Sequence, residues 1–412
     1  MTTHAKLKPS LFVGLICGLL LAVLAFSQSA ASIGLAIDGF RPLGGSFFSW
    51  RVGQTNAALT LSAKGTKVNA AAAERLGQAA LEHAPLTTRS LWLVGKSMEI
   101  RGELPKARHA MLQAERISRR DGAVQLWLGV DSLRQGSIAP GLRHFDLMIR
   151  SDMEAADVVM PRLALIILSP TGRQYLSPYI RESNPWMLNL LQVAVTDLPQ
   201  AAPIAELLIE RGKKAPDIHG IRQVYSILMD RLVKEKSYTL ALRLYPLLPG
   251  AREESLRNVS GTEKGKVDQG YPPFTWLFSN DSARGADFVG VAGGKTGLDI
   301  FGAPGTIGIA ATKFLALRPD DYFFWSIKER GANLDGGATW IATCLVGAGK
   351  GKEVVSGNML NSSISLNRIQ KMPMPADCQL VRLDMRVSGG IGRDPVNLIV
   401  GDMDLVRNTK GQ

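Results

Sequence analysis

Apolar and small residues alternate with polar ones at helical spacing in the first half of the chain. Within residues 88–121, one apolar face falls at i, i+3, i+4 and i+7, the pattern of an amphipathic helix, and Gly102 marks the end of that helix. A second apolar face follows, with alanines where two helix backbones approach closely. The positions are Leu91, Val94, Gly95 and Met98 in the first helix and Ala107, Met111 and Ala114 in the second. The pattern predicts a helix hairpin.

This hairpin pattern repeats every 34 residues. Gly95 and Gly102 have counterparts at Gly129 and Gly136 in the next copy, and the preceding copy, residues 54–87, retains mainly its second helix. A period of this length, with small and large apolar residues at fixed offsets, is typical of stacked helix hairpins. Such arrays usually present a curved surface to a partner.

The helical pattern continues to residue 250 but loses its fixed period after residue 155. Prolines divide residues 156–250 into short apolar pieces, and residues 222–255 fit the repeat loosely as a fourth copy. Because proline is tolerated in the first turn of a helix, several of these prolines mark helix starts. We interpret the stretch as degenerate repeats and predict an all-α solenoid over residues 54–250.

The central hairpin resembles the tetratricopeptide repeat family. Gly95, Gly102, Ala107 and Ala114 stand at the family's glycine and alanine positions, whereas Leu91 and Met98 replace its tryptophan and tyrosine. The alternative is an unrelated helical array with accidental spacing. The resemblance implies a concave groove that binds a protein partner.

The first-helix positions that line this groove in the tetratricopeptide family are occupied here by Arg89, Trp92, Lys96 and Glu99. Tryptophan and arginine are frequent anchors of protein interfaces. The alternative for these four residues is plain solvation.

The pattern changes at Tyr271, where helical periodicity gives way to short strands separated by Gly, Asn and Asp. Residues 379–387 alternate polar and apolar side chains, as a half-buried strand does. Many short and evenly punctuated strands predict an antiparallel β-sandwich over residues 271–408, preceded by a polar linker over 251–270. The expected strands cover residues 274–278, 286–291, 308–317, 322–329, 338–345, 363–369, 379–387 and 397–407.

Two segments of this region resemble the jelly-roll carbohydrate-binding modules of bacterial envelope proteins. One is the strand–turn–strand of residues 314–322, and the other is the pair Trp340 and Cys344 followed by residues 375–383. The resemblance implies a jelly-roll architecture, and carbohydrate binding follows from it by fold analogy alone.

Four aromatic residues of the sandwich are the candidates for glycan binding: Trp276, Tyr322, Trp325 and Trp340. An exposed ring holds a sugar by stacking on it, although a place in the core is the alternative for each ring. Because adjacent strand residues face opposite ways, Tyr322 shares one face with Phe324, and Phe323 shares the other with Trp325. One of these two pairs must face outward or be covered by another element.

The N-terminus carries an export signal. Lys6 and Lys8 precede residues 9–37, which contain no charged side chain, so the positive end is expected in the cytoplasm. We favour an uncleaved transmembrane helix over residues 11–33, within a cytoplasmic stub and anchor of residues 1–37; cleavage after Ala31 is the alternative. A membrane-proximal linker over residues 38–53 would follow. The protein is thus expected in the bacterial inner membrane as a single-pass protein with its bulk in the periplasm.

Cysteine usage agrees with export. Cys17 falls within the apolar span, and Cys344 and Cys378 are the other two cysteines of the chain. Two cysteines in an exported domain usually form a disulfide, so we predict a Cys344–Cys378 bond. The alternative is a pair of buried free thiols.

Charge and motifs narrow the function further. The net charge of +12 lies mainly in the helical part, where 33 basic residues face 23 acidic ones before residue 271. These basic residues are scattered without interleaved aromatic residues, so we expect no nucleic acid partner. Residues 290–296 and 347–353 imitate phosphate-binding loops but lack the required spacing or hydroxyl.

No catalytic constellation stands out in the sequence. The five histidines are scattered without ligand spacing, and Asp320 and Asp321 lie at a turn, so we expect no metal, no cofactor and no catalytic residues. The sequence therefore favours a membrane-anchored, non-enzymatic extracytoplasmic adaptor with a possible glycan-binding sandwich, in envelope or exopolysaccharide assembly or export. The alternatives are a glycan-processing enzyme with its site in the sandwich and a purely structural subunit of an envelope complex.

Overall fold

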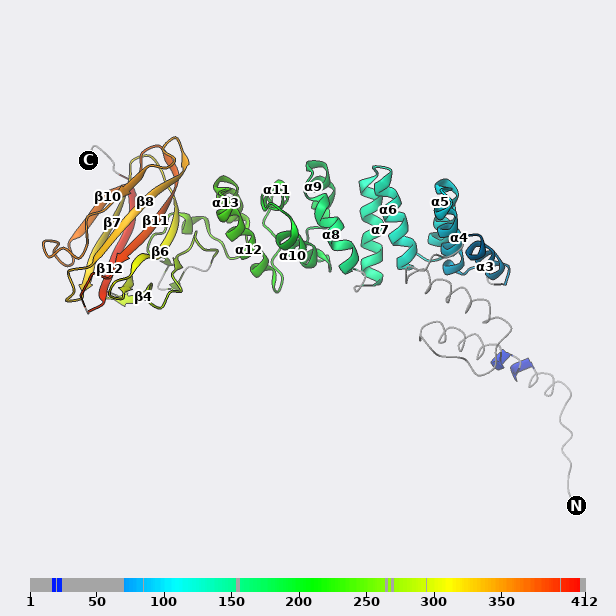
Figure 1. Cartoon of the computed structure of the whole chain (residues 1–412), viewed down its shortest axis with the longest axis horizontal. Helices are drawn as coiled ribbons and strands as arrows, with labels where there is room; N and C mark the ends of the chain where they lie inside the picture. Colours follow the sequence, from blue (N-terminus) through cyan, green and yellow to red (C-terminus); the bar gives the residue numbers. More distant parts are fainter. Residues whose placement is uncertain are drawn as a thin grey trace, which may run out of the picture. The chain divides into compact units, whose positions relative to one another are not determined.

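The computed structural model describes residues 17–19, 21–23, 70–83, 85–152, 156–263, 266–267, 270–293, 295–392 and 394–407. The chain divides into two compact units, Met1–Val159 and Met160–Gln412. Along the chain, helices come first and strands follow (Figure 1).

Little of the predicted export signal falls within the described residues. Of residues 11–33, the structure describes 17–19 and 21–23, which are helical, and the predicted linker over residues 38–53 lies outside the described part. Among the described helices, none combines the length and the apolar character needed to cross a membrane.

The first unit consists of paired helices. α4 and α6 begin 34 residues apart, as do α5 and α7, and the helices of each pair contact one another, which confirms the helix hairpins predicted from the sequence. α3 precedes α5 by the same interval and packs on α4. The helices are α3 (Ala70–His83), α4 (Thr88–Ile100), α5 (Leu104–Ile117), α6 (Gly122–Arg134) and α7 (Ile138–Ser151).

Glycines set the geometry of these hairpins. Gly102 has a left-handed φ of 82°, which lets its N–H and that of Glu103 bond back to the last turn of α4. Gly95 serves close packing instead, since a Cβ there would lie 3.0 Å from Met111 Cε and 3.2 Å from the Ala107 carbonyl oxygen. The glycines of the sequence repeat therefore mark a turn and a helix contact, respectively.

Helices of the second half keep more of the period than the sequence predicts. α8 begins 34 residues after α6, and α12 begins 34 residues after α10. α10 contacts α12, and α11 contacts α13. The helices are α8 (Ala156–Ile166), α9 (Pro170–Leu176), α10 (Met187–Asp197), α11 (Ala202–Glu210), α12 (Ile221–Lys234) and α13 (Tyr238–Leu244), with short 3₁₀ turns η1 (Ser177–Tyr179), η2 (Tyr245–Leu247) and η3 (Glu253–Leu256).

The strands form two five-stranded antiparallel sheets, which confirms the predicted antiparallel sandwich. One sheet has the order β10-β7-β12-β5-β4 and the other β3-β6-β11-β8-β9. A short pair, β1 (Thr262–Glu263) and β2 (Lys266–Val267), precedes them. The strands are β3 (Leu277–Phe278), β4 (Arg284–Val291), β5 (Lys295–Gly302), β6 (Ile307–Ala316), β7 (Asp321–Arg330), β8 (Gly337–Gly347), β9 (Glu353–Val355), β10 (Ile369–Pro373), β11 (Cys378–Ser388) and β12 (Val396–Arg407).

The short pair β1 and β2 was not expected, and three strands of the two five-stranded sheets also differ from the prediction. β5 and β9 were not expected, and β10 begins where the strand predicted over 363–369 was to end. β5 could not be recognised in the sequence because it contains two glycines and follows a glycine-rich turn. In the structure, a Cβ at Gly297 would lie 2.5 Å from the Val400 carbonyl oxygen of β12. That glycine allows a close strand contact. The ends of the phosphate-loop imitation are paired strand residues of the β4–β5 hairpin, Gly290 with Thr296 and Val291 with Lys295.

A disulfide joins two neighbouring strands of the second sheet. Cys344 of β8 is bonded to Cys378 of β11, with a Cα–Cα distance of 5.7 Å, so the predicted bond is confirmed. Disulfides are typical of proteins that fold in oxidising compartments outside the cytoplasm.

The segment between α13 and the sandwich is attached to the sandwich core. Both terminal nitrogens of Arg257 donate to the Asp321 carboxylate at the start of β7, at 2.7 and 3.1 Å. Val259 is buried in the sandwich core, and its carbonyl oxygen accepts a hydrogen bond of 2.9 Å from Trp276 Nε1. Residues 257–259 of the polar stretch 251–270 are thus part of the sandwich structure.

Candidate functional site

The four residues predicted to line a groove lie on α4 with different surroundings. Arg89 is exposed, whereas Trp92 is half-buried and packs against a small core made by α5 and α6. Lys96 and Glu99 form an ion pair of 2.5 Å with each other. Trp92 therefore contributes to helix packing in addition to any surface that it offers.

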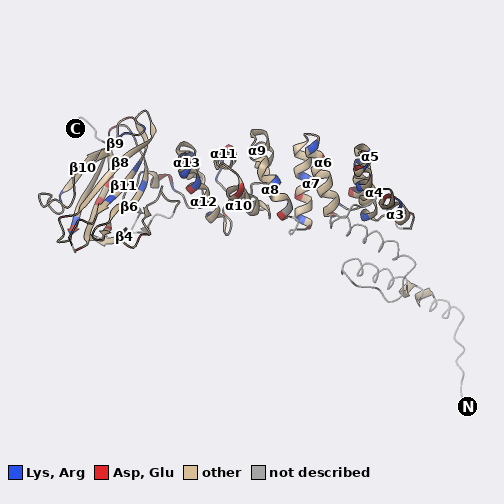
Figure 2. Ribbon diagram, viewed as in Figure 1, with Lys and Arg blue, Asp and Glu red and all other residues tan. Residues whose placement is uncertain are grey.

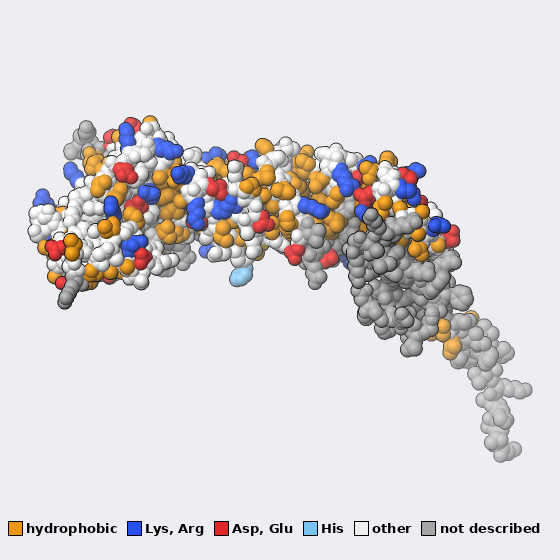
Figure 3. Space-filling model, viewed as in Figure 1, with side chains coloured by type: hydrophobic (Ala, Val, Ile, Leu, Met, Phe, Trp, Pro, Cys, Tyr) orange, Lys and Arg blue, Asp and Glu red, His pale blue; other side chains and the backbone are white. Residues whose placement is uncertain are grey.

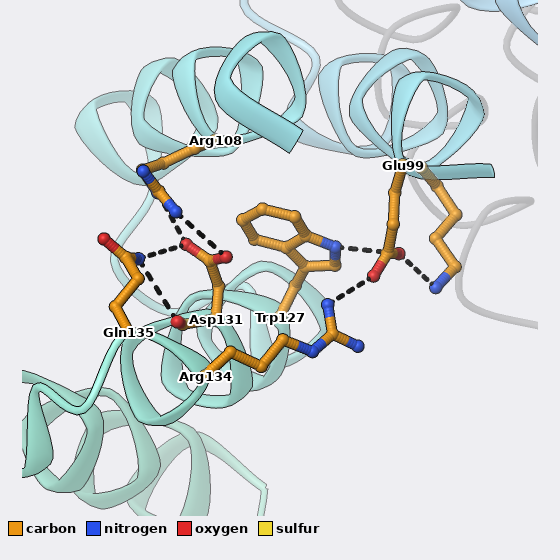
Figure 4. Close-up of polar contacts among 7 residues, drawn as sticks. Glu99, Arg108, Trp127, Asp131, Arg134 and Gln135 are labelled. Carbon is orange, nitrogen blue, oxygen red and sulfur yellow. Dashed lines mark hydrogen bonds and ion pairs between the residues drawn. The ribbon is translucent and has the colours of Figure 1, made fainter. Parts of the chain in front are cut away.

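Glu99 is the centre of a polar cluster that joins α4 to α6 (Figure 4). Its carboxylate accepts from Lys96 Nζ, from Trp127 Nε1 at 3.0 Å and from Arg134 at 2.9 Å. Burial by itself would raise the pKa of Glu99, but the hydrogen bonds from Lys96, Arg134 and Trp127 outweigh it and lower this pKa to about 2. The carboxylate is 14% exposed, so it serves mainly to connect the two helices.

A second cluster connects α5 to α6. Asp131 is buried and accepts from Arg108 Nε at 2.6 Å and from Gln135 Nε2 at 2.8 Å (Figure 4). Sequence reasoning named Lys96 and Glu99 as groove residues but missed the contacts between helices, because the residues that meet across helices lie 23 to 35 positions apart in sequence. Glu99 thus connects α4 to α6, and Asp131 connects α5 to α6.

Three of the four aromatic residues predicted to bind glycans belong to the sandwich core. Trp276, Trp325 and Trp340 are 6%, 3% and 0% exposed, respectively. Trp276 and Trp340 lie with ring centroids 6.0 Å apart, and Trp325 stacks on Phe323 at 5.1 Å. These three tryptophans are therefore core residues, which is the alternative that the sequence left open.

Tyr322 lies on the outer face of the first sheet. The alternation along β7 turns Phe323 and Trp325 inward, and it turns Tyr322 and Phe324 outward, where both are half-buried with ring centroids 6.5 Å apart. Lys371 Nζ of β10 lies 5.9 Å from the centre of the Tyr322 ring. The outward pair forms an aromatic surface on this sheet.

Charged side chains flank this aromatic pair on the neighbouring strands. In the strand register, Phe324 stands between Lys371 of β10 and Asp404 of β12. Residues that are directly opposite in neighbouring strands lie within contact range of one another. Phe324 therefore has a cation on one side and a carboxylate on the other.

A hollow of about 850 Å³ opens beside Phe324. Its lining includes Lys295 and Thr296 of β5, Ile369 of β10, and Asp402 and Asp404 of β12. Asn258 and Ser260, from the segment attached to the sandwich core, complete the polar part of this lining.

A β-bulge lies at this hollow. The pairing of β12 with β7 shifts between Gly401 and Asp404, and the pairing of β12 with β5 ends at Val400. Within the bulge, Asp402 has a left-handed φ of 48°, which is uncommon for a residue with a side chain. Bulges of this kind re-aim side chains and often occur beside functional sites.

The Asp402 side chain pairs with two lysines, Lys295 of the hollow lining and Lys328 of β7. One carboxylate oxygen accepts from Lys295 Nζ at 2.9 Å, and the other accepts from Lys328 Nζ and from Ser326 Oγ at 2.9 Å. The hydrogen bonds from Lys328 and Lys295 hold the pKa of Asp402 well below its usual range. Asp402 is therefore ionised at neutral pH and acts as a fixed acceptor.

The Asp402 carboxylate is not suited to act as a general acid. Glycoside hydrolysis usually requires a carboxyl group with a raised pKa as proton donor, which Asp402 is not. Burial does raise the pKa of Asp384 on β11, but this side chain is only 4% exposed and is hydrogen-bonded to Thr312 and Arg382. Within the described ranges, no group of three or more His, Cys, Asp and Glu side chains has the geometry of a metal site.

Charges of both signs are mixed over the molecule. Figure 2 shows Lys and Arg interspersed with Asp and Glu along helices and strands, and the face drawn in Figure 3 has the same mixture among hydrophobic side chains. Local ion pairs such as those of Glu99 and Asp402 fit this distribution.

Sequence reasoning found one residue of this site, Tyr322, and missed Lys295, Asp402 and Asp404. The alternation of β7 pairs Tyr322 with Phe324, and it was the available signal for an outward ring pair. Two aspartates separated by one residue in the last strand were the available signal for the carboxylates.

Comparison with known proteins does not identify a family. No protein-family model matches the chain, and no curated protein is similar to it at a significant level.

Proposed function

We propose that this protein is a non-catalytic, extracytoplasmic binding protein whose sandwich holds carbohydrate on the outer face of the sheet β10-β7-β12-β5-β4. The observation that carries the proposal is the outward pair Tyr322 and Phe324, with Lys371 and Asp404 on either side. Sugar rings stack on aromatic faces through their C–H groups, while their hydroxyls bond to charged and amide groups nearby. The disulfide supports the extracytoplasmic placement.

The strand order supports a jelly-roll architecture for the sandwich. The eight strands β5 to β12 are distributed as β5, β12, β7 and β10 in one sheet and β6, β11, β8 and β9 in the other. This is the order of two interleaved Greek keys, the arrangement that defines jelly rolls, which include many lectin domains. The likeness of this strand order to that of lectin domains favours a glycan ligand but does not identify one.

The helical hairpins would act as a tetratricopeptide-like adaptor for a protein partner. The 34-residue period and the paired helices α4–α7 support this part of the proposal. With the predicted anchor over residues 11–33, the protein would be held in the bacterial inner membrane near machinery for envelope or exopolysaccharide assembly or export.

A glycan-array screen of the full chain tests the carbohydrate proposal. We expect binding to at least one glycan class. Tyr322→Ala and Phe324→Ala should each weaken this binding by about tenfold, because stacking of a ligand ring on an aromatic side chain contributes about 1 kcal/mol or more. Phe301→Ala is the matched control, since Phe301 is 38% exposed on β5, away from the residues that line the hollow. Absence of binding to every class, or equal loss in all three variants, would refute the proposal.

The enzymatic alternative has one observation in its favour, because Asp402 and Asp404 both line the hollow. Paired carboxylates are the usual machinery of glycoside hydrolysis. Incubation of the full chain with each bound glycan, followed by assay of new reducing ends, separates the two functions. We expect no release; release that Asp404→Asn abolishes would establish the enzyme.

A further inference from the structure

Two cations and two carboxylates lie at the β12 bulge, of which one cation, Lys328, is outside the lining of the hollow. Lys295, Asp402 and Asp404 line it, and Lys328 contacts Asp402 from β7. Both carboxylate oxygens of Asp402 are occupied by lysines. The negative charge of Asp402 therefore offsets the positive charge of these two lysines, which an anionic ligand would otherwise meet.

The same groups leave a donor and an acceptor facing the hollow. The Lys295 side chain is 67% exposed and has three N–H donors, of which Asp402 takes one. Asp404 is exposed and presents its carboxylate from the same strand as Asp402, with one oxygen accepting from the Leu405 N–H. A sugar hydroxyl can accept from an ammonium and donate to a carboxylate, whereas a ligand carboxylate can only accept.

We propose that the hollow, defined by Lys295, Asp402 and Asp404, is a subsite that selects an uncharged sugar residue and disfavours a uronic acid. This inference rests on the proposed carbohydrate function and names the class of glycan. The ring pair Tyr322 and Phe324 supplies stacking that any sugar can use, and the hollow beside it discriminates. Asp402 is the selectivity-determining residue, because it neutralises the two lysines that would otherwise attract an anion.

The left-handed backbone of Asp402 makes a clean test feasible. Asparagine adopts this conformation as readily as aspartate does, so Asp402→Asn removes the charge without a new backbone strain. In that variant Lys295 and Lys328 lose their carboxylate partner, and the hollow gains net positive charge. The subsite should then attract acidic sugars.

The experiment measures binding of the full chain to matched polysaccharide pairs that share a backbone and differ by a C6 carboxylate. The pairs are glucan and polyglucuronate, mannan and polymannuronate, and galactan and polygalacturonate. In the bound pair, we expect the neutral form to bind about tenfold more tightly, because like charges brought together in an interface are penalised. Asp402→Asn should reverse or remove this preference, and its gain for the acidic form should decline at high salt.

Lys295→Gln is the second variant, chosen because an exposed side chain is replaced without risk to the core. It should weaken the neutral form by about threefold to tenfold, since one charge-assisted hydrogen bond to the ligand is lost. Thermal melting of each variant separates loss of binding from loss of folding.

The outcomes distinguish this inference from the proposed function. Tighter binding of the acidic form by the unmodified chain would overturn the inference, as would an unchanged preference in Asp402→Asn. If Tyr322→Ala still abolishes binding in those cases, the carbohydrate function stands and only the selectivity claim fails. If none of the six polysaccharides binds, the selectivity inference fails, and the carbohydrate function fails with it only where the glycan array shows no binding either.

Discussion

Glu99 in the helices and Asp402 in the sandwich have the same kinds of hydrogen-bond partner but lie in different surroundings. Each carboxylate accepts from two cations and one neutral donor, and each has a lowered pKa. Glu99 is 14% exposed between α4 and α6, whereas Asp402 lies in a bulge with the 67% exposed Lys295 beside an open hollow.

The comparison shows that an ion cluster gains its role from what surrounds it. The partners of Glu99 come from two helices, so the cluster determines how these helices meet. The partners of Asp402 come from β5 and β7, strands whose core-facing residues already fix their positions. The first cluster should therefore matter for stability, and the second for a ligand.

The largest expected effect concerns the disulfide, which stabilises the sandwich and not the helices. The bond closes a loop with a sequence separation of 34 residues, and the chain-entropy model values such a loop at roughly 4 kcal/mol. We expect Cys344→Ala with Cys378→Ala to lower the free energy of unfolding of the sandwich by about 2–4 kcal/mol. Urea titration followed by hydrogen exchange resolves the two parts; equal loss of protection in α4–α7 would show that they are not independent.

The next effect compares the two carboxylates directly. Glu99→Gln should cost about 1–3 kcal/mol of folding free energy, because three donors lose a charged acceptor in a mostly buried place. Asp402→Asn should cost less, about 1 kcal/mol, since Lys295 is 67% exposed and stays solvated, and Lys328 keeps Asn367 Oδ1 as an acceptor. Urea unfolding of both variants measures this difference. Equal costs would show that the two clusters have the same structural role.

A third prediction uses pH to isolate the charge of Glu99. Its pKa of about 2 in the folded state lies below the usual glutamate value of 4.5, so its contribution to stability is present above pH 4.5 and lost as the pH falls to 2. The difference in unfolding free energy between the unmodified chain and Glu99→Gln should therefore shrink across this window. A difference that stays constant from pH 7 to pH 2.5 would assign the loss to packing instead.

The pH dependence of stability that is due to Asp384 should have the opposite sign, so this residue serves as an internal check. Burial raises its pKa in the folded state, so its ionised form destabilises the sandwich and protonation relieves that cost. Acidification should therefore destabilise the Asp384→Asn variant more than the unmodified chain. Identical pH profiles for the two proteins would exclude this effect.

The last prediction concerns Trp92. This ring packs on the core made by α5 and α6, so Trp92→Ala should lower the free energy of unfolding by about 1–3 kcal/mol even where no partner is present. Gly95→Leu should cost more, because its side chain would collide with Met111 and the Ala107 carbonyl. A melting temperature unchanged by Trp92→Ala would restore a purely surface role for this ring.

The helices could be predicted from sequence because their pattern is local. The spacing of Gly95, Gly102 and their counterparts fixes the hairpins without knowledge of any distant contact. The alternation of β7 likewise paired Tyr322 with Phe324, but it did not show which pair faces outward. That choice depends on which face of the sheet meets the second sheet, which a single strand does not reveal.

The hollow could not be predicted for a related reason. The bulge at Asp402 is a change of register between β12 and β7, strands that are about 75 residues apart in sequence at this point. Lys295 reaches Asp402 across 107 residues, from a strand that its glycines concealed. Local spacing gives no information about such contacts, so the site emerges only when both sheets are in place.

The most direct test of the central claim is a hydrogen-exchange map of the full chain with and without the best-binding glycan. We predict slower exchange at the edge strand β10 and around the bulge of β12, next to Tyr322 and Phe324, and no change in α4 or α6. Protection confined to the helices, or to the sheet β3-β6-β11-β8-β9, would contradict the assignment of the outer face as the carbohydrate site.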